Sequence, residues 1–304
     1  MSDKIITVFG ATGKQGGAVI ETLAKSKKFK LRAITRNPDS PASQELKKKG
    51  VELVKLDMTT ASVDDFAKAL TGSYGLFLVT DFYTYFGAEA DIGKKVVDGA
   101  VKAKVEHFVF SSLSACKKIT KGEIPVPHFD LKDDIKVYAE EKAKNGAFVL
   151  STILVPFYYQ NFESYFPPTK SADGTYYTIT MPQEANVPLD IGDVNDVGPI
   201  VEAILNDKQK YAGVTIPFTT PLKMQEIVDK ISKATGKTIK YNYVPPEVFA
   251  KFGFPGAEEF AHMFSFYNKH GAFPGQDTTI APKLTKLTTF DEYLNNNKYY
   301  DNLQ

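Results

Sequence analysis

The chain has 304 residues, a length that suits one large domain or two small ones. Hydrophobic residues make up 43% and charged residues 24%, as is ordinary for a globular protein with a sizeable core. The formal net charge of +1 lacks the basic excess with which strong nucleic-acid binders neutralise phosphates, so direct nucleic-acid binding is not expected.

The cysteine and histidine content limits which disulfides and metal sites the protein can contain. The single cysteine, Cys116, cannot form an internal disulfide and fits a reducing compartment. We interpret it as an inert residue, with a redox switch as the alternative. The four histidines show no metal-ligand spacing, so no metal site is expected. Without a signal segment or a run approaching ~20 apolar residues, we expect a cytoplasmic protein with no membrane association, and nuclear entry is left open.

The first part of the chain alternates short apolar runs with helical patterns, which is typical of βαβ units. The pattern predicts strands over 5–9, 31–35, 51–56, 76–80, 107–110 and 148–154, and helices over 14–25, 63–70 and 89–104. Right-handed crossovers would wind these elements into a Rossmann-type, doubly wound parallel sheet. We therefore expect an α/β fold whose residues 1–156 form a Rossmann domain.

The character of the chain changes after residue 156. Prolines and aromatic residues become dense over 157–168, and helix–strand alternation is lost. A helix around Met224 to Ile231 and a strand over 239–244 follow, and Pro245-Pro246 opens another helical stretch. We predict a smaller C-terminal α/β subdomain over 157–304, lying across the ends of the sheet, with some segments returning to it. The aromatic segment 157–166 is interpreted as packing between subdomains, with a partner-binding surface as the alternative.

A glycine-rich segment follows the first predicted strand and opens the first helix. Residues 10–16 read G-A-T-G-K-Q-G, with the spacing G-x-x-G-x-x-G. We expect Gly10 to allow a tight turn, Gly13 to let the backbone approach a pyrophosphate and Gly16 to permit close helix–strand packing. The start of the helix offers free N–H groups and a positive dipole end to phosphates. The segment therefore predicts dinucleotide binding, against the alternative of a purely structural turn.

The residue type at the end of the second strand distinguishes NAD-binding sites from NADP-binding sites. An NAD site normally has an acid there, which accepts from the ribose 2′-hydroxyl. Residues 35–38 instead read T-R-N-P, and the guanidinium of Arg36 suits a phosphate. A surface arginine after a strand is the alternative. The missing acid favours NADP (NADPH/NADP⁺) as the cofactor.

Five segments carry a family resemblance: VFGATGKQGGAV (Val8–Val19), ITRNP (Ile34–Pro38), HFDLK (His128–Lys132), PFYYQNF (Pro156–Phe162) and KFGFPGAEEFAHMFSFY (Lys251–Tyr267). Through them nearly the whole chain resembles the NmrA-like family, atypical relatives of the extended short-chain dehydrogenase/reductases. An animal member of that family is described as an NADPH sensor. The resemblance therefore implies an NADP(H)-binding protein that senses redox state.

The same resemblance implies roles for individual residues. The pyrophosphate would be cradled by Gly10, Ala11, Thr12, Gly13, Lys14 and Gln15. The 2′-phosphate would be surrounded by Arg36, Asn37, Pro38, Asp39 and Ser40. The adenine would be flanked by Asp57 and Met58, and the ribose bordered by Leu78, Val79 and Thr80. Lys132 would reach the nicotinamide ribose, and the nicotinamide end would be closed by Tyr158, Tyr159, Gln160 and Asn161.

A catalytic site is less clear in the sequence. Reductase relatives use Ser, Tyr and Lys, with Tyr and Lys four residues apart on a helix. Tyr138 and Lys142 have that spacing, but Lys142 lies too close to the sixth strand, whereas Lys132 lies at the right distance. The residue four before Lys132 is His128, which can transfer protons near neutral pH or simply pack locally. The candidates are therefore Lys132, His128 and Ser112, which ends the fifth strand.

Two functions remain open from the sequence. The first is a regulatory protein with little or no turnover, in which NADP(H) changes a surface that a protein partner recognises. The second is an NADPH-dependent oxidoreductase of a small carbonyl or quinone. Direct transcription-factor action is disfavoured, because no DNA-binding motif is recognisable. A homodimer is compatible with either function.

Overall fold

The computed structural model describes residues 3–303, and a seven-stranded parallel sheet forms its centre. The strand order is β11-β6-β5-β4-β1-β2-β3. Its strands are β1 (Ile5–Val8), β2 (Lys30–Thr35), β3 (Glu52–Lys55), β4 (Ser73–Leu78), β5 (His107–Ser112), β6 (Val149–Leu154) and β11 (Thr215–Pro217). The predicted Rossmann-type α/β fold is confirmed.

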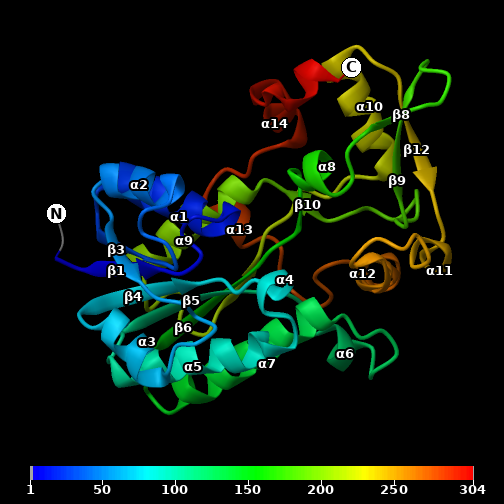
Figure 1. Cartoon of the computed structure of the whole chain (residues 1–304). Helices are drawn as coiled ribbons and strands as arrows, with labels where there is room; N and C mark the ends of the chain where they lie inside the picture. The colour runs from blue at the N-terminus through cyan, green and yellow to red at the C-terminus, as the bar shows by residue number, and fades with distance from the viewer. Residues whose placement is uncertain (1–2, 304) are drawn as a thin grey trace.

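Helices cover both faces of this sheet (Figure 1). One layer contains α3 (Val63–Leu70), α5 (Glu89–Lys102) and α7 (Pro127–Lys144). The opposite layer contains α1 (Lys14–Ser26), α2 (Pro41–Lys48) and α9 (Val197–Asn206). Each layer closes over its own cluster of buried apolar side chains, as expected for a sheet buried on both faces.

The fourth strand begins and ends earlier than the sequence predicted. It was expected over 76–80, but β4 ends at Leu78 and starts at Ser73. The hydroxyl groups of Ser73 and of Thr7 in β1 form a hydrogen bond, with 2.6 Å between their oxygens. This bond allows a polar residue inside the sheet. Val79 and Thr80 instead leave the strand and line a cleft. The apolar pattern therefore placed the strand too late.

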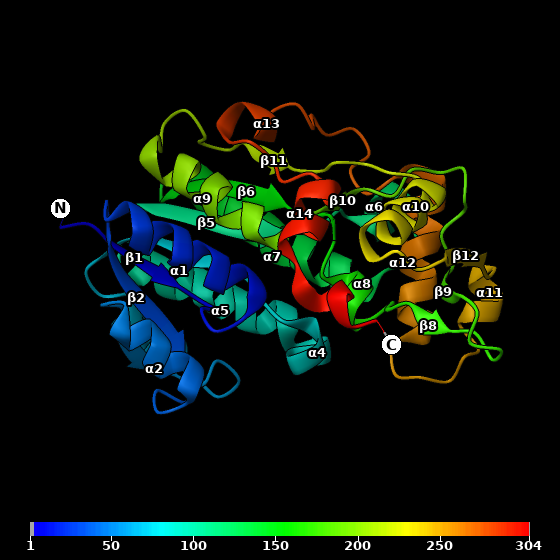
Figure 2. The same ribbon diagram turned by 90° about the horizontal axis from the view of Figure 1, so that it is seen from above.

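The C-terminal half adds smaller elements beyond the carboxyl ends of the strands (Figure 2). Two small sheets are built from β7 (Phe157–Tyr158) with β10 (Ile191–Gly192), and from β8 (Thr169–Lys170), β9 (Tyr177–Met181) and β12 (Ile239–Tyr243). The helices there are α8 (Asn161–Ser164), α10 (Met224–Thr235), α11 (Pro246–Phe249), α12 (Ala257–His270) and α14 (Phe290–Asn296). Helix α13 (Ala281–Leu284) instead packs against α9 at the central sheet. Short helical turns complete the chain: α4 (Phe82–Tyr85), η1 (Phe86–Ala88), α6 (Cys116–Ile119), η2 (Val194–Asp196) and η3 (Lys298–Asn302).

The expected loss of helix–strand alternation after residue 156 is wrong for one stretch. Helix α9 packs against α1, and β11 then pairs with β6 as the seventh strand of the sheet. The sequence predicted that some segments would return to the sheet but did not identify these, because α9 contains Gly198 and Pro199 in its first turn and β11 is only three residues long and ends in Pro217.

The aromatic segment after residue 156 packs largely inward. Phe157, Phe162 and Phe166 are buried in a third apolar cluster, together with side chains of α10, α12 and α14. Within residues 3–303, no helix combines the length and the apolar character that crossing a membrane requires.

Candidate functional site

A cleft of about 680 Å³ lies over the carboxyl ends of the central strands. Residues following β1, β2, β3, β4 and β6 line it, together with the end of β5 and one side of α12. The chain order reverses at β1, whose neighbours are β2 and β4. Open α/β sheets bind ligands in the crevice outside such a switch point.

The glycine-rich turn at this point is shaped by close backbone contacts. Gly10 has φ +66°, and a Cβ there would lie 2.7 Å from Cγ1 of Val79. A Cβ on Gly16 would lie 2.3 Å from the Gly10 carbonyl oxygen. Both positions therefore require glycine. The predicted tight turn at Gly10 and close packing at Gly16 are confirmed.

The start of α1 faces the cleft without a competing acceptor. Its N-cap is Gly13, no side chain caps it, and its first turn contains no acidic residue. The first N–H groups of a helix lack partners within the helix and carry a partial positive charge. Next to them, Ser111 of β5 donates a hydrogen bond of 2.6 Å to Oε1 of Gln15. The arrangement suits a phosphate or another anion.

A cation stands at the end of the cleft next to β2. Arg36 lines the cleft and is exposed, and its side chain makes no hydrogen bond or ion pair with any residue from 3 to 303. Hydrogen bonds from Thr59 lower the pKa of the nearby Asp57, and the charge of Arg36 contributes. Asn37 and Ser40 also line this end, and Ser40 caps α2 by accepting from the backbone N–H of Ser43 at 3.2 Å.

The cleft brings together most of the residues that were predicted to bind a cofactor. Its lining contains Gly10, Thr12, Gly13, Lys14, Gln15, Arg36, Asn37, Ser40, Met58, Val79, Thr80, Lys132, Tyr158 and Asn161. The remaining predicted residues lie outside the lining: Ala11, Pro38, Asp39, Asp57, Leu78, Tyr159 and Gln160.

The structure gives several of these outlying residues structural contacts. Tyr159 is fully buried, and its hydroxyl contacts Thr220 and donates to the backbone oxygen of Thr288 at 2.9 Å. Gln160 donates to Asp193 at 2.8 Å and accepts from the backbone N–H of Val194 at 3.2 Å. Both residues therefore hold the C-terminal half together.

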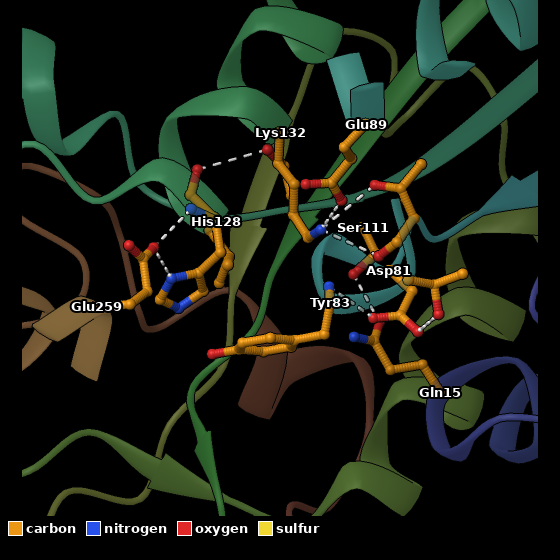
Figure 3. A network of polar contacts seen from close by, with 12 residues as sticks. Gln15, Asp81, Tyr83, Glu89, Ser111, His128, Lys132 and Glu259 are labelled. Atoms are coloured by element: carbon orange, nitrogen blue, oxygen red, sulfur yellow. Dashed lines mark hydrogen bonds and ion pairs between the residues drawn. The ribbon is translucent and has the colours of Figure 1, made fainter. Parts of the chain in front are cut away.

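Lys132 lies in the cleft on α7 and is held by a buried carboxylate (Figure 3). Its Nζ donates to the backbone oxygen of Thr80 at 3.0 Å and forms an ion pair with Glu89, the first residue of α5. Glu89 is fully buried, and the second oxygen of its carboxylate has no partner among the described residues. Burial lowers the pKa of Lys132, and the charge of Glu89 opposes that effect. The ammonium group is thus engaged within the protein.

His128, one turn before Lys132 on α7, forms a second pair. Its backbone N–H donates to Oε1 of Glu259 at 2.8 Å, and Nδ1 lies 2.5 Å from the same oxygen. Both side chains are mostly buried, with exposed fractions of 11% and 14%. Burial raises the pKa of Glu259, but the hydrogen bonds from His128 outweigh it and hold the pKa below its ordinary value. Glu259 therefore stays ionised and orients the imidazole.

The other catalytic candidates differ in their positions. Ser112 lines the cleft and is fully buried, and its hydroxyl donates to the backbone oxygen of Leu113 at 3.4 Å. Tyr138 and Lys142 lie outside the cleft, where Tyr138 donates to Asp98 of α5 at 2.8 Å. Cys116 is buried, and burial raises the pKa of its thiol, which favours the unreactive protonated form.

Sequence reasoning missed several residues of the cleft. Glu89 and Glu259 pair with residues 43 and 131 positions away, so no local pattern could predict the pairs. Glu259 does lie within the motif KFGFPGAEEFAHMFSFY, which was the one available signal. The sequence also gave no role to the cleft-lining residues Asp81, Tyr83, Phe260, Met263 and Tyr267. Tyr165, which belongs to the aromatic segment interpreted as packing between subdomains, instead lines the cleft and is 55% exposed.

The fold and the cleft define a Rossmann-type α/β protein with a ligand crevice at its topological switch point. A family model described as NmrA-like family matches residues 2–294. The chain belongs to the NmrA-like family, which confirms the resemblance seen in the sequence.

Relatives and solved structures agree with this assignment. The chain is 35% identical to an NmrA-like family domain-containing protein of Dictyostelium discoideum, over 98% of this chain and 99% of the relative. It is 32% identical to the NmrA-like family domain-containing oxidoreductase ptmS of Penicillium ochrochloron, over 91% and 87%. Solved structures of NmrA, a negative transcriptional regulator, in complex with NAD and with NADP each share 23% identity and a TM-score of 0.82, over 97% of this chain and 95% of NmrA. At that identity the structures establish the fold.

Proposed function

We propose that this chain binds NADP(H) in the cleft and acts as a regulatory protein whose occupancy a protein partner recognises. The observation that carries the proposal is an uncapped helix start beside a cation whose side chain has no partner in the described part of the chain. The uncapped start of α1, the Gly10 turn and Arg36 lie in one cleft. NmrA, of the same family, has been solved with NAD and with NADP.

The residues present fit this cofactor. Amides at the start of α1 would hold the pyrophosphate, and Arg36 with Asn37 and Ser40 would hold the 2′-phosphate. In the stretch from Arg36 to Ser40 the only acid is Asp39, which lies outside the lining. A carboxylate at the position of Arg36 would repel a phosphate, whereas a guanidinium binds one. These residues support a preference for the phosphorylated dinucleotide.

Arg36→Ala tests the cofactor preference. Because hydrogen bonds to charged groups contribute about 1.5–3 kcal/mol, we expect NADPH affinity to fall about 10- to 150-fold and NADH affinity to change little. Isothermal titration calorimetry with both cofactors measures the difference. Lys55→Ala is the matched control, because it removes an exposed positive charge that does not line the cleft. Equal losses for NADPH and NADH would remove Arg36 from the 2′-phosphate site.

The residues at the expected catalytic positions, Lys132 and His128, favour a regulatory role. Reductases of the wider group need a tyrosine whose pKa a free lysine lowers. Here Lys132 is engaged by Glu89, and His128 occupies the position four residues earlier. Binding without turnover leaves the cofactor available as a signal. A ligand shifts a conformational equilibrium by its differential affinity for two states, so a partner that selects one state would respond to NADP(H).

Reduction of a small carbonyl or quinone is the second candidate, and the Glu259–His128 pair favours it. A base oriented by a third group is typical of acid–base sites. NADPH, when bound, supplies a hydride. His128 would hold a proton at Nε2 for the substrate oxygen, while Glu259 would stabilise the charged imidazole.

Turnover measurements separate the two candidates. For the regulatory role we expect NADPH absorbance to stay constant with a panel of aldehydes and quinones, in wild type and His128→Ala alike. Sustained oxidation of NADPH that disappears in His128→Ala would establish the reductase and reject a role without catalysis. Calorimetry of NADPH with the same variant confirms that the cofactor still binds.

A further inference from the structure

One end of the cleft is built mainly from rings. We define the aromatic end of the cleft as Tyr83, His128, Tyr165, Phe260 and Met263, all of which line it. These residues come from α4, α7, α12 and the residue after α8, so the chain brings them together from distant segments. None of them belongs to the phosphate-binding part formed by the glycine turn and Arg36.

The rings form a continuous group. Tyr83 lies 6.2 Å from the His128 ring and 6.4 Å from the Phe260 ring, between centroids. The Tyr165 ring lies 5.5 Å from that of Phe260. Tyr83 and Tyr165 nevertheless remain exposed by 39% and 55%, although large aromatic side chains usually bury their faces. Their uncovered ring surface is available to a flat partner.

A single directed polar group accompanies these rings. Glu259 holds His128 through Nδ1, so Nε2 is the ring nitrogen left for another partner, on the opposite side of the ring (Figure 3). Within the described part of the chain, Nε2 has no hydrogen-bond partner. With Nδ1–H donating to Glu259, a neutral ring accepts at Nε2, and a protonated ring donates there.

Charge at this end argues against an anionic ligand. The cations of the lining lie elsewhere or are paired: Lys14 is in the glycine turn, Arg36 follows β2, and Lys132 is held by Glu89. Glu259 adds a negative charge beside His128. An anion would therefore face a carboxylate without a free lysine or arginine at the aromatic end.

We propose that the aromatic end is a second binding site, for a flat aromatic molecule without negative charge whose hydroxyl or carbonyl oxygen bonds Nε2 of His128. Tyr83 and Tyr165 stack on the rings of the ligand, and Glu259 is the positioning residue that fixes the imidazole. The inference rests on the proposed function, because NADP(H) occupies the remainder of the cleft. It names the ligand class and holds whether or not turnover follows.

2-Naphthol is a suitable probe for the wild-type protein saturated with NADP⁺. It is flat, uncharged near neutral pH and fluorescent, and the chain contains no tryptophan whose emission would interfere. We expect saturable binding. Tyr83→Ala and Tyr165→Ala should each weaken it about three- to tenfold, while NADP⁺ affinity stays unchanged. Phe252→Ala is the control, because Phe252 is 48% exposed but lies outside the cleft lining, and it should bind 2-naphthol like wild type.

Three analogues test the chemical class. Naphthalene lacks the oxygen, decahydro-2-naphthol lacks the flat rings, and 2-naphthalenesulfonate has a permanent negative charge. We expect each of them to bind at least about fivefold more weakly than 2-naphthol, which is the loss expected when one hydrogen bond or one stacking contact is removed. Equal binding of the sulfonate would overturn the assignment of a ligand without negative charge.

The role of His128 has its own spectroscopic signature. With ¹⁵N-labelled histidine, the four ring systems can be followed separately by long-range ¹H–¹⁵N NMR. We expect 2-naphthol to shift Nε2 of His128 and to leave His107, His262 and His270 unchanged. In Glu259→Gln the Nδ1–H form of His128 should lose its dominance and 2-naphthol affinity should fall severalfold, with the thermal midpoint recorded in parallel.

The outcomes distinguish this inference from the proposed function. Protein that binds NADP⁺ but not 2-naphthol would overturn the second site and leave the cofactor proposal intact. Binding of 2-naphthol without a shift at His128, or without loss in Tyr83→Ala and Tyr165→Ala, would also overturn it. Failure to bind NADP⁺ would instead reject the proposed function, and this inference with it.

Discussion

At the residue scale, Tyr158 and Tyr159 are neighbours with opposite hydrogen-bond status. The hydroxyl of Tyr158 is buried without a partner in the described part of the chain, whereas that of Tyr159 contacts Thr220 and donates to Thr288. An unpaired buried hydroxyl is unfavourable, but a paired one stabilises the fold. The two tyrosines, which were predicted to have the same role, therefore differ in what their hydroxyls contribute.

Two variants test this difference. Tyr159→Phe removes both contacts and should lower the free energy of unfolding by about 1–2 kcal/mol. Tyr158→Phe should leave the free energy of unfolding unchanged or raise it, because no bond is lost. Urea denaturation of both proteins measures the effects. A larger loss in Tyr158→Phe than in Tyr159→Phe would contradict this account.

Individual residues also show where sequence reasoning ends. Gly10 and Gly16 could be assigned correctly, because a strand–turn–helix with glycines at this spacing has one well-known geometry. The pairs Lys132–Glu89 and His128–Glu259 could not, because each joins residues that only the tertiary fold brings together. The sequence likewise indicated a guanidinium at Arg36 but could not predict that its side chain has no partner among residues 3–303.

At the element scale, the junction of β1 and α1 depends on one close backbone approach. Gly16 and Gly17 are adjacent in α1, but a Cβ on Gly16 would lie 2.3 Å from the Gly10 oxygen, whereas a Cβ on Gly17 would lie 3.7 Å from the nearest atom. The first distance is a collision with backbone, and the second is an ordinary contact. The two glycines form a matched pair.

Gly16→Ala should therefore displace the turn, lower the free energy of unfolding by about 1–3 kcal/mol and abolish detectable NADPH binding. Gly17→Ala should bind NADPH normally and gain up to about 1 kcal/mol in stability, because alanine favours a helix interior. Calorimetry and urea denaturation of both variants measure these outcomes. Normal NADPH binding by Gly16→Ala would show that the close approach is not needed for the site.

Elements with strong periodicity were predicted well, and short ones were not. Helix α1, predicted over 14–25, spans Lys14–Ser26. The helices predicted over 63–70 and 89–104 are α3 and α5, which span Val63–Leu70 and Glu89–Lys102. Helix α2 was not predicted, because its eight residues contain a single buried apolar side chain, Leu46. The unit formed by α9 and β11 was not identified from the sequence, because glycine and proline residues interrupt its apolar pattern.

At the scale of the whole molecule, Asp196 joins the sheet side to the C-terminal side. It ends η2, just before α9, and accepts from the backbone N–H and the hydroxyl of Thr288, at 2.9 and 2.8 Å. Thr288 precedes α14, whose side chains belong to the C-terminal cluster. Burial raises the pKa of Asp196 to about 6, against the opposing hydrogen bonds from Thr288.

This raised pKa gives a defined pH dependence of stability. The folded protein binds the proton of Asp196 more tightly than the unfolded chain, whose aspartate has a pKa of about 3.9. Stability from this group is therefore fully present below about pH 4 and falls by on the order of 2–3 kcal/mol as the pH rises to about 6. Asp196→Asn, which cannot ionise, should lack that decline relative to wild type.

Urea denaturation of wild type and Asp196→Asn at several pH values between 4 and 7 measures the difference. Asp173→Asn is the control: hydrogen bonds from Ser171 and Thr175 hold the pKa of Asp173 at about 2, so its contribution changes only at lower pH. Wild type and Asp173→Asn should therefore run parallel in this window. Parallel curves for wild type and Asp196→Asn would show that Asp196 does not titrate there.

The late return of β11 to the sheet constrains how the chain can be divided. A fragment cut at residue 156 would expose the hydrogen-bonding groups of β6 that β11 satisfies, and would strip α9 from the apolar side of α1. Unpaired strand edges beside uncovered apolar surface promote self-association. The first half therefore depends on a strand some sixty residues later in the chain for the pairing of its edge, and a ribosome must complete that stretch before the edge of β6 and the apolar side of α1 are covered.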